Sequence, residues 1–269
     1  MLVRLCPLMN RSFFLALSAA GLAFGLAGCA TTSTKPVADT RVYEMRIYYA
    51  PPGKLEDLHA RFRDHTTKLF PKHGIQNIGY WVPVDNSENK LVYLLAYPSR
   101  EAREASWKAF MADPEWKAVQ KKTEANGRIV AKVESFFLNT TDFSPAVKTG
   151  NVSKGGVFEL RTYTTPEGRL PNLDARFRDH TVKLFAKHGI NNWGYFHKTS
   201  DQPAASTTLL YFVTHKSQDG AKASFGAFGQ DPDWKAAKAE SEKNAGGSLT
   251  VEGGVTSQFL VPTDYSPTK

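Results

Sequence analysis

Cysteine is nearly missing from this sequence: Cys6 and Cys29 are the only two among 269 residues. Both lie near the N-terminus, so the body of the protein can form no internal disulfide, and a disulfide-stapled fold is excluded. Long blocks of like charge and low-complexity tracts are missing as well. With 41% hydrophobic and 22% charged residues, the chain has the composition of a globular protein. Its length favours two domains over one.

The motifs of the common catalytic and cofactor-binding families are also missing. The sequence contains no HExxH, no GxSxG, no phosphate-binding loop and no dinucleotide fingerprint. No two histidines, and no histidine with a carboxylate, have the spacing of a dedicated zinc site. These absences exclude zinc proteases, α/β-hydrolases and nucleotide-binding enzymes of the usual kinds. The sequence therefore predicts neither a metal ion nor a cofactor.

Positive charge exceeds negative charge, with 34 Lys and Arg against 26 Asp and Glu. Loss of an N-terminal signal with Arg4 and Arg11 lowers the formal net charge of +8 by two, and the remainder is still basic. This excess favours an acidic ligand or anionic lipid headgroups as a partner. The basic residues are spread along the chain and form no stripe, so nucleic acid is not an expected partner.

The first 28 residues have the pattern of an export signal. Two arginines precede the apolar stretch Ser12–Leu26, which is somewhat short for a membrane span. The quartet Leu26-Ala27-Gly28-Cys29 resembles the bacterial lipobox, in which the chain is cut before the cysteine and the thiol is diacylated. We therefore expect that the protein is exported and anchored by a lipid at Cys29 to a bacterial membrane, on the side that faces the periplasm or cell surface. The alternative is an N-terminal membrane anchor that is not cleaved. Residues 29–40 are expected to be a flexible tether.

The rest of the chain is an internal repeat. RFRDHTTKLFPKHGI at 61–75 recurs as RFRDHTVKLFAKHGI at 176–190, and the stretch around Asp113-Pro114-Glu115-Trp116 recurs at Asp231. Thr141-Asp142-Phe143-Ser144-Pro145 likewise recurs at Thr263. The repeat predicts a first domain at 41–145, a linker at 146–156 and a second domain at 157–267.

Each copy reads as strand, helix, strand, strand, helix, strand. In the first copy we expect strands at 41–49, 77–84, 90–97 and 128–138, and helices at 54–73 and from a cap at Ser99 to about Met111, restarting at Asp113-Pro114. This βαββαβ order is the ferredoxin-like α+β unit, whose open sheet face must be covered. Two tandem units can cover each other, which predicts an intrachain pseudo-dimer with a cavity between the sheets. Two such pseudo-dimers could associate further.

These motifs resemble those of the NIPSNAP family, and they do so in both copies. The pattern is a Tyr/Phe-Glu-Leu/Met-Arg first strand, a helix ending in Lys-His-Gly, a Gly-Tyr/Trp second strand and an Asp-Pro-Glu/Asp-Trp motif in the second helix. The resemblance implies the dimeric α/β-barrel superfamily, which includes small-molecule monooxygenases and haem-binding enzymes. NIPSNAP members mostly lack an assigned reaction, and some are associated with mitochondria and protein interaction.

Alternation along the first strand of each copy separates its apolar residues from a Glu, an Arg and a Tyr. We expect the apolar set to pack under the helices and the polar set to point into the space between the sheets. There the polar set could bind a ligand, or it could form an ion pair that bridges the two halves. These candidates are Glu44, Arg46 and Tyr48 in the first copy and Glu159, Arg161 and Tyr163 in the second.

The histidines are weaker candidates. His65 and His180 lie on the apolar helical face, where a core histidine is expected over a general base or haem ligand. His73 and His188 precede the helix-ending glycines and are expected to interact with the helix dipole. His197 and His215 occur only in the second copy, on a strand face shared with its tyrosines, which slightly favours that copy as the one with a working ligand pocket.

Taken together, the sequence favours a non-enzymatic envelope lipoprotein that binds a small molecule or a partner protein. The alternative is an enzyme of the cofactor-independent monooxygenase or haem-handling type. The two differ in the predicted space between the sheets. An enzyme should have a pocket there with Glu44, Arg46 or a histidine reaching into it, whereas a binding or structural pair should have that space filled.

Overall fold

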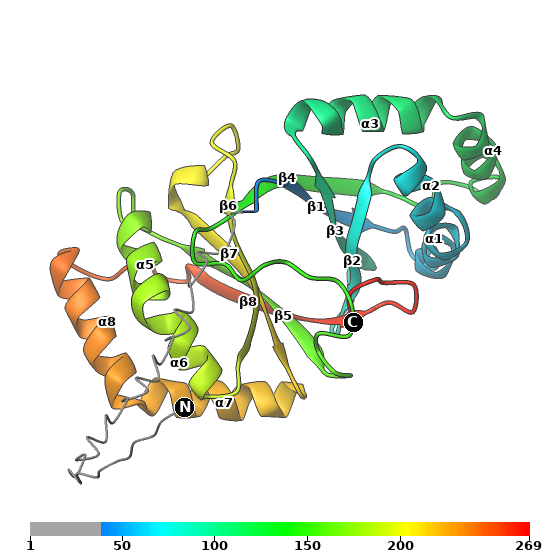
Figure 1. The fold of residues 1–269 in the computed structure, drawn as a ribbon. Helices are drawn as coiled ribbons and strands as arrows, with labels where there is room; N and C mark the ends of the chain where they lie inside the picture. The colour runs from blue at the N-terminus through cyan, green and yellow to red at the C-terminus, as the bar shows by residue number, and fades with distance from the viewer. Residues whose placement is uncertain (1–38) are drawn as a thin grey trace, which may run out of the picture. The chain divides into compact units, whose positions relative to one another are not determined.

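Eight strands, four from each copy of the repeat, close into one barrel with helices on its outside (Figure 1). The structure is a computed structural model that describes residues 39–269. The predicted signal, Cys29 and most of the predicted tether lie outside the described residues. The strand order around the barrel is β1-β3-β2-β8-β5-β7-β6-β4. The predicted α+β fold, an intrachain barrel of two ferredoxin-like units, is confirmed.

The two repeats contain the same elements in the same order. The strands are β1 (Val42–Tyr49), β2 (Gln76–Pro83), β3 (Lys90–Tyr97) and β4 (Lys132–Thr140), then β5 (Val157–Thr164), β6 (Asn191–Lys198), β7 (Thr208–His215) and β8 (Val255–Pro262). The helices are α1 (Leu55–Arg61), α2 (Thr67–Lys72), α3 (Arg100–Ala112) and α4 (Pro114–Thr123), then α5 (Leu170–Arg176), α6 (Val182–Lys187), α7 (Gln218–Gln230) and α8 (Pro232–Asn244). A short 3₁₀ turn, Ala205–Thr207, precedes β7.

The predicted helix starts agree with the caps that the side chains form. The Ser99 hydroxyl accepts a hydrogen bond from the backbone N–H of Ala102, and the Asp113 carboxylate accepts one from the N–H of Glu115. Pro114 occupies the first position of α4, where its missing N–H costs nothing. The fourth strand starts at Lys132, four residues later than predicted, because residues 128–131 form an irregular approach to it.

The apolar faces of both sheets meet inside the barrel. Tyr43 and Met45 from β1 share one buried cluster with Trp81, Phe158 and Leu160, so residues of both repeats fill the interior. The prediction that the apolar face of β1 packs under the helices is therefore wrong, and so is the predicted cavity between the sheets. Alternation separates two faces of a strand but does not say which is inside. Here the strands form a closed barrel, so the apolar faces point into its interior, away from water.

The outer face of each half-barrel packs against its own helices. In the first repeat this second core holds Phe62 and Phe70 from the helices together with Tyr80 and Tyr93 from the sheet. Trp116 also belongs to it. The second repeat has a matching third core. The polar residues of β1 and β5 thus lie between sheet and helices, where any site they form must be sought.

A π-helical turn interrupts the first helix of each repeat, at Phe62–Thr66 and Phe177–Thr181. Its wider turn changes the phase of the apolar stripe. His65 is therefore only half-buried and His180 is exposed, so the expectation of a core histidine at these positions is wrong. His73 and His188 follow the last residues of α2 and α6, and the Nε2 of each lies within hydrogen-bond distance of the aspartate that caps α4 or α8, at 2.7 and 2.6 Å.

The repeats also exchange their C-terminal segments. After β8, residues 263–267 cross to the first repeat, where Arg63 donates to Asp264 at 2.6 Å and Tyr265 stacks on Phe62. The reciprocal contacts from the segment after β4 are Arg178 to Asp142 at 2.7 Å and Phe143 stacked on Phe177. The barrel closes through β2 with β8 and β4 with β6, again one strand from each repeat. Within residues 39–269, no helix is long and apolar enough to cross a lipid bilayer.

Candidate functional site

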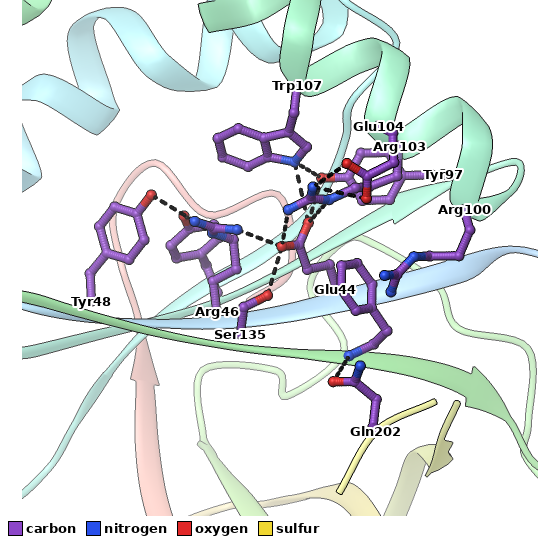
Figure 2. A network of polar contacts seen from close by, with 12 residues as sticks. Glu44, Arg46, Tyr48, Tyr97, Arg100, Arg103, Glu104, Trp107, Ser135 and Gln202 are labelled. Carbon is purple, nitrogen blue, oxygen red and sulfur yellow. Dashed lines mark hydrogen bonds and ion pairs between the residues drawn. The ribbon is translucent and has the colours of Figure 1, made fainter. Parts of the chain in front are cut away.

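Glu44 is the centre of a polar network between β1 and α3 (Figure 2). Its carboxylate is fully buried and accepts hydrogen bonds from Arg46 on the same strand and from Arg103 on α3, the latter at 3.0 and 2.7 Å. Further donors to the Glu44 carboxylate are Ser135 at 2.7 Å, Tyr97 at 3.1 Å and Trp107 at 3.2 Å. The six side-chain donor atoms come from β1, β3, β4 and α3.

These donors keep Glu44 ionised. Burial by itself would raise its pKa, but the hydrogen bond from Arg103 and the charges of Arg46 and Arg103 lower the pKa of Glu44 to about 2. A carboxylate with so low a pKa and so many donors stays ionised near neutral pH and is a poor base for a substrate proton. Glu44 therefore joins α3 to the sheet. The predicted ion pair between Glu44 and Arg46 forms, but it does not bridge the two halves, because every partner of Glu44 lies in its own repeat.

The second repeat keeps only part of this network. Glu159 still accepts from Arg161, but Ala221 and Phe225 stand where the first repeat has Arg103 and Trp107, counting from the caps Ser99 and Ser217. His215 ends β7 at the position of Tyr97 in β3, and its Nε2 lies 2.8 Å from Glu159. Burial opposes ionisation of Glu159, but the hydrogen bond from His215 and the charge of Arg161 hold its pKa below the usual value. The two polar centres have thus diverged.

A pocket of about 440 Å³ lies beside the Glu44 network, between the outer face of the sheet and α1 to α4. Arg46 forms part of its wall, with its guanidinium over the ring of Trp107 at 4.4 Å. Most of the lining is aromatic or aliphatic. The apolar and aromatic lining residues are Tyr48, Phe62, Phe70, Trp107, Phe110, Met111, Trp116, Val130, Ala131 and Val133.

The charged lining of this pocket is mainly positive. Arg46, Arg61, Arg128 and Lys132 face a single acid, Glu124, among the charged residues of the wall. Glu124 accepts a hydrogen bond from Nη1 of Arg61 at 2.8 Å. The Nε of Arg61 and the indole N–H of Trp116 are buried without a hydrogen-bond partner in residues 39–269. Buried donors without partners are rare and costly, so these two mark where an acceptor would gain most.

The residues predicted from the sequence end in different places. Arg46 and Tyr48 line the pocket, whereas Glu44 lies behind Arg46 (Figure 2). In the second repeat, Arg161 donates to Tyr211 at 3.0 Å and is also paired with Glu159, and Tyr163 packs against Phe177.

His197 in β6 and His215 in β7 lie on the same sheet face, as expected, but at opposite ends of the β6–β7 pair. His197 lies opposite Leu209, six residues before His215, and its Nε2 is 2.9 Å from Asp174. Six residues along a strand span roughly 20 Å, so the two histidines cannot share one small ligand.

Sequence reasoning missed the cationic and aromatic wall of the pocket. Arg61 opens the stretch that recurs in both copies, and Trp116 lies in the recurring Asp-Pro-Glu-Trp motif, so repetition marked both residues. Nothing in the local sequence marked Arg128 or Lys132, which reach the pocket only because the irregular approach to β4 passes its rim.

The pocket offers no histidine, so a haem bound through histidine, considered from the sequence, would lack its axial ligand there. Across residues 39–269, no three His, Cys, Asp or Glu side chains come together in the manner of a metal site.

Comparison with known proteins agrees with this architecture. The NIPSNAP family model matches residues 43–145 and 158–267, which together make up most of the chain. No curated protein is significantly similar to the chain in sequence.

Among solved structures, the fold is similar to a protein from Lactobacillus acidophilus NCFM provisionally named a monooxygenase, with 12% identity, a TM-score of 0.52 and coverage of 83% of this chain and 94% of that one. A similarly named protein from Fusobacterium nucleatum has 11% identity and a TM-score of 0.52 over 87% and 96% of the two chains. An anthrone oxidase-like protein has 15% identity and a TM-score of 0.51 over 87% and 97%. At these identities the likeness establishes the fold alone.

Proposed function

Because this chain belongs to the NIPSNAP family, we propose that it is a small-molecule binding protein whose ligand occupies the pocket of the first repeat. The ligand has an anionic group and a flat apolar body. The protein is exported and held at a bacterial membrane by a lipid at Cys29, and it does not transform its ligand.

The buried, unpartnered donors of Arg61 and Trp116 are the observation that carries this proposal. A carboxylate or phenolate oxygen placed between them would satisfy both and would meet the excess positive charge of the wall. The rings of Trp107, Phe110 and Trp116 offer an aromatic body edge and face contacts. A volume of about 440 Å³ lies within the usual range for small-molecule sites.

The wall also favours binding over oxygenation, the second candidate function. Oxygenation of a phenol or anthrone without a cofactor requires a base that ionises the substrate. The acid on the wall, Glu124, is paired with Arg61, and the nearby Glu44 is held by Arg46 and Arg103. Both carboxylates therefore already have arginine partners. The similarity to proteins named monooxygenases supports the second candidate only through the fold.

The test compares two probes of one skeleton, naphthoate and naphthylmethylamine, by their effect on the melting temperature. At a hundredfold excess over its Kd, naphthoate should stabilise the protein by about 2.7 kcal/mol, equivalent to roughly 5–10 °C. The amine should give no shift. Arg128→Gln and Lys132→Gln, both at exposed positions, should weaken the effect of naphthoate without unfolding the protein.

Arg61→Gln should abolish the shift, and Arg176→Gln, the same change at the matching position of the second repeat, should leave it intact. Equal shifts with both probes, or equal loss in both arginine variants, would refute the proposed pocket. An oxygen electrode separates the two functions, because protein-dependent oxygen uptake with the bound probe would establish the oxygenase.

The anchor has its own test. Cys29→Ala should move the protein from the membrane fraction to the soluble fraction, because an acylated thiol supplies the membrane affinity. Retention of this variant in the membrane fraction would contradict the proposed anchor and leave the pocket untouched.

A further inference from the structure

The second repeat has a pocket of its own, of about 680 Å³, where β7 ends and α7 begins. The segment that joins the repeats forms one side, and the first turns of α7 form another. Its polar lining residues are Ser153, Lys154, Asn191, His215, Lys216 and Ser224. None of them belongs to the pocket proposed above, so this site stands independently of that function.

His215 is the unusual group in this pocket. It is 2% exposed, and its Nε2 is held 2.8 Å from the buried carboxylate of Glu159. Its Nδ1 is buried too and has no hydrogen-bond partner in the described part of the chain. The Nε2–H of His215 donates a hydrogen bond to the ionised Glu159. Nδ1 is therefore an acceptor in the neutral ring and a donor in the imidazolium. A ligand here must suit one of these two states.

The residues that line this pocket favour an anion. Lys154 and Lys216 line the pocket, and no Asp or Glu of residues 39–269 is among its lining residues. The hydroxyl of Ser153 is buried without a partner in the same range. The pocket also adjoins the N-terminus of the 13-residue helix α7, where Gly220 is part of the lining. The N–H of Gly220 already donates to the capping Ser217, so this helix end favours negative charge through the dipole of the helix.

We propose that this pocket binds a phosphate group, either as the free ion or as a phosphate monoester. Phosphate loses its second proton near neutral pH, so it presents charged oxygens to the lysines and to Ser153 and still has a P–OH for part of the time. The P–OH donates to Nδ1 of the neutral ring, and a charged oxygen accepts from the imidazolium. One ligand group therefore satisfies either state of His215. The size of the pocket leaves room for the organic part of an ester.

The first repeat has no histidine at the position of His215, and the comparison shows what that residue contributes. Tyr97 stands at the position of His215 and donates to Glu44, while its oxygen accepts from Trp107 at 2.7 Å. The hydroxyl of Tyr97, its only polar side-chain atom, has both of its partners within the first repeat. The exchange of tyrosine for histidine has thus placed a free nitrogen in the second repeat while keeping the bond to the glutamate.

This correspondence supplies a variant that should fold. His215→Tyr keeps a hydrogen bond to Glu159, as Tyr97 does with Glu44, and removes only the free nitrogen. Inorganic phosphate, titrated into the purified protein at constant ionic strength, should shift the imidazole nitrogen resonances of His215 saturably in NMR spectra. In His215→Tyr the affinity, measured by calorimetry, should fall about tenfold or more, since a hydrogen bond to a charged group is lost. Lys154→Gln with Lys216→Gln should lower it further.

His197→Gln is the matched control, because His197 lies at the other end of the sheet and is bound to Asp174. Its phosphate affinity should equal that of the wild type. A titration with glycerol phosphate identifies the source of the group: tighter binding than inorganic phosphate indicates a monoester, and equal binding indicates the free ion. Absence of saturable binding by either probe, or unchanged affinity in His215→Tyr, would overturn the proposal.

Discussion

Replacing Glu44 with Gln tests whether its network joins α3 to the barrel. The substitution keeps the size of the side chain and removes its charge. Arg46 and Arg103, whose side chains are 12% and 15% exposed, would then remain largely buried without their carboxylate. Breaking a buried pair in this way costs about 3–5 kcal/mol. Such a loss is a third or more of the stability of many domains.

The pKa of Glu44 gives a second way to obtain the energetic cost of Glu44→Gln. Its value of about 2 lies roughly 2.5 units below the ordinary 4.5, and at 1.36 kcal/mol per unit this corresponds to about 3 kcal/mol. Because the folded state lowers the pKa, this stabilisation is complete above the unfolded value and is lost as the pH falls toward 2. Both routes agree on a cost of about 3 kcal/mol near neutral pH.

Urea unfolding of Glu44→Gln and the wild type at pH 7 and pH 3 measures this cost. We expect a difference of about 3 kcal/mol in the free energy of unfolding at pH 7 and a clearly smaller one at pH 3. Glu104→Gln is the control, because Glu104 pairs with the same Arg103 but is 60% exposed, and it should cost less than about 1 kcal/mol. A cost for Glu44→Gln below that of the control, or one that does not change with pH, would refute the reasoning.

Three further predictions concern the exchanged segment and the interior. Burial lowers the pKa of His59, which lies 2.8 Å from the Tyr265 hydroxyl, so the melting temperature should fall as the pH drops below about 6.5, and His59→Gln should flatten this dependence. Tyr265→Ala should lower the free energy of unfolding by roughly 2–4 kcal/mol in urea, since it removes an aromatic ring that joins the repeats. Gly79→Ala would place a Cβ 2.2 Å from the ring of Trp81 and should lower the free energy of unfolding by roughly 1–3 kcal/mol. Gly194→Ala is the control and should cost clearly less, because its Cβ would lie 3.0 Å from its nearest neighbour. Equal melting temperatures of these two variants would contradict this prediction.

The helix caps and the limits of β3 could be read from the sequence because they depend on neighbours along the chain. Ser99 and Asp113 form the predicted caps, and β3 has the predicted bounds of Lys90–Tyr97. The π-helical turn at Phe62–Thr66 escaped the periodic pattern because a single wide turn leaves the composition of the helix unchanged. This turn and its counterpart at Phe177–Thr181 move His65 and His180 away from the core.

The candidate site was predictable only in part. Arg46 and Tyr48 were identified as polar residues on one strand face, and both line the pocket. The side of the sheet on which they lie was wrongly predicted, because a period of two residues is the same for either orientation. Arg128 and Lys132 join the pocket from a segment more than 80 residues away from Arg46, and no local pattern reports such a distance.

By itself, the sequence determined that one α+β unit occurs twice and that the two copies must cover each other, since each unit has a sheet face it cannot bury alone. The tertiary structure decided the rest: which face is inside, how the C-terminal segments cross between repeats, and where the pockets lie. These features depend on contacts between residues far apart in the chain. The two repeats therefore share one architecture, while Tyr97 and His215, at the same position in each, give their polar centres different chemistry.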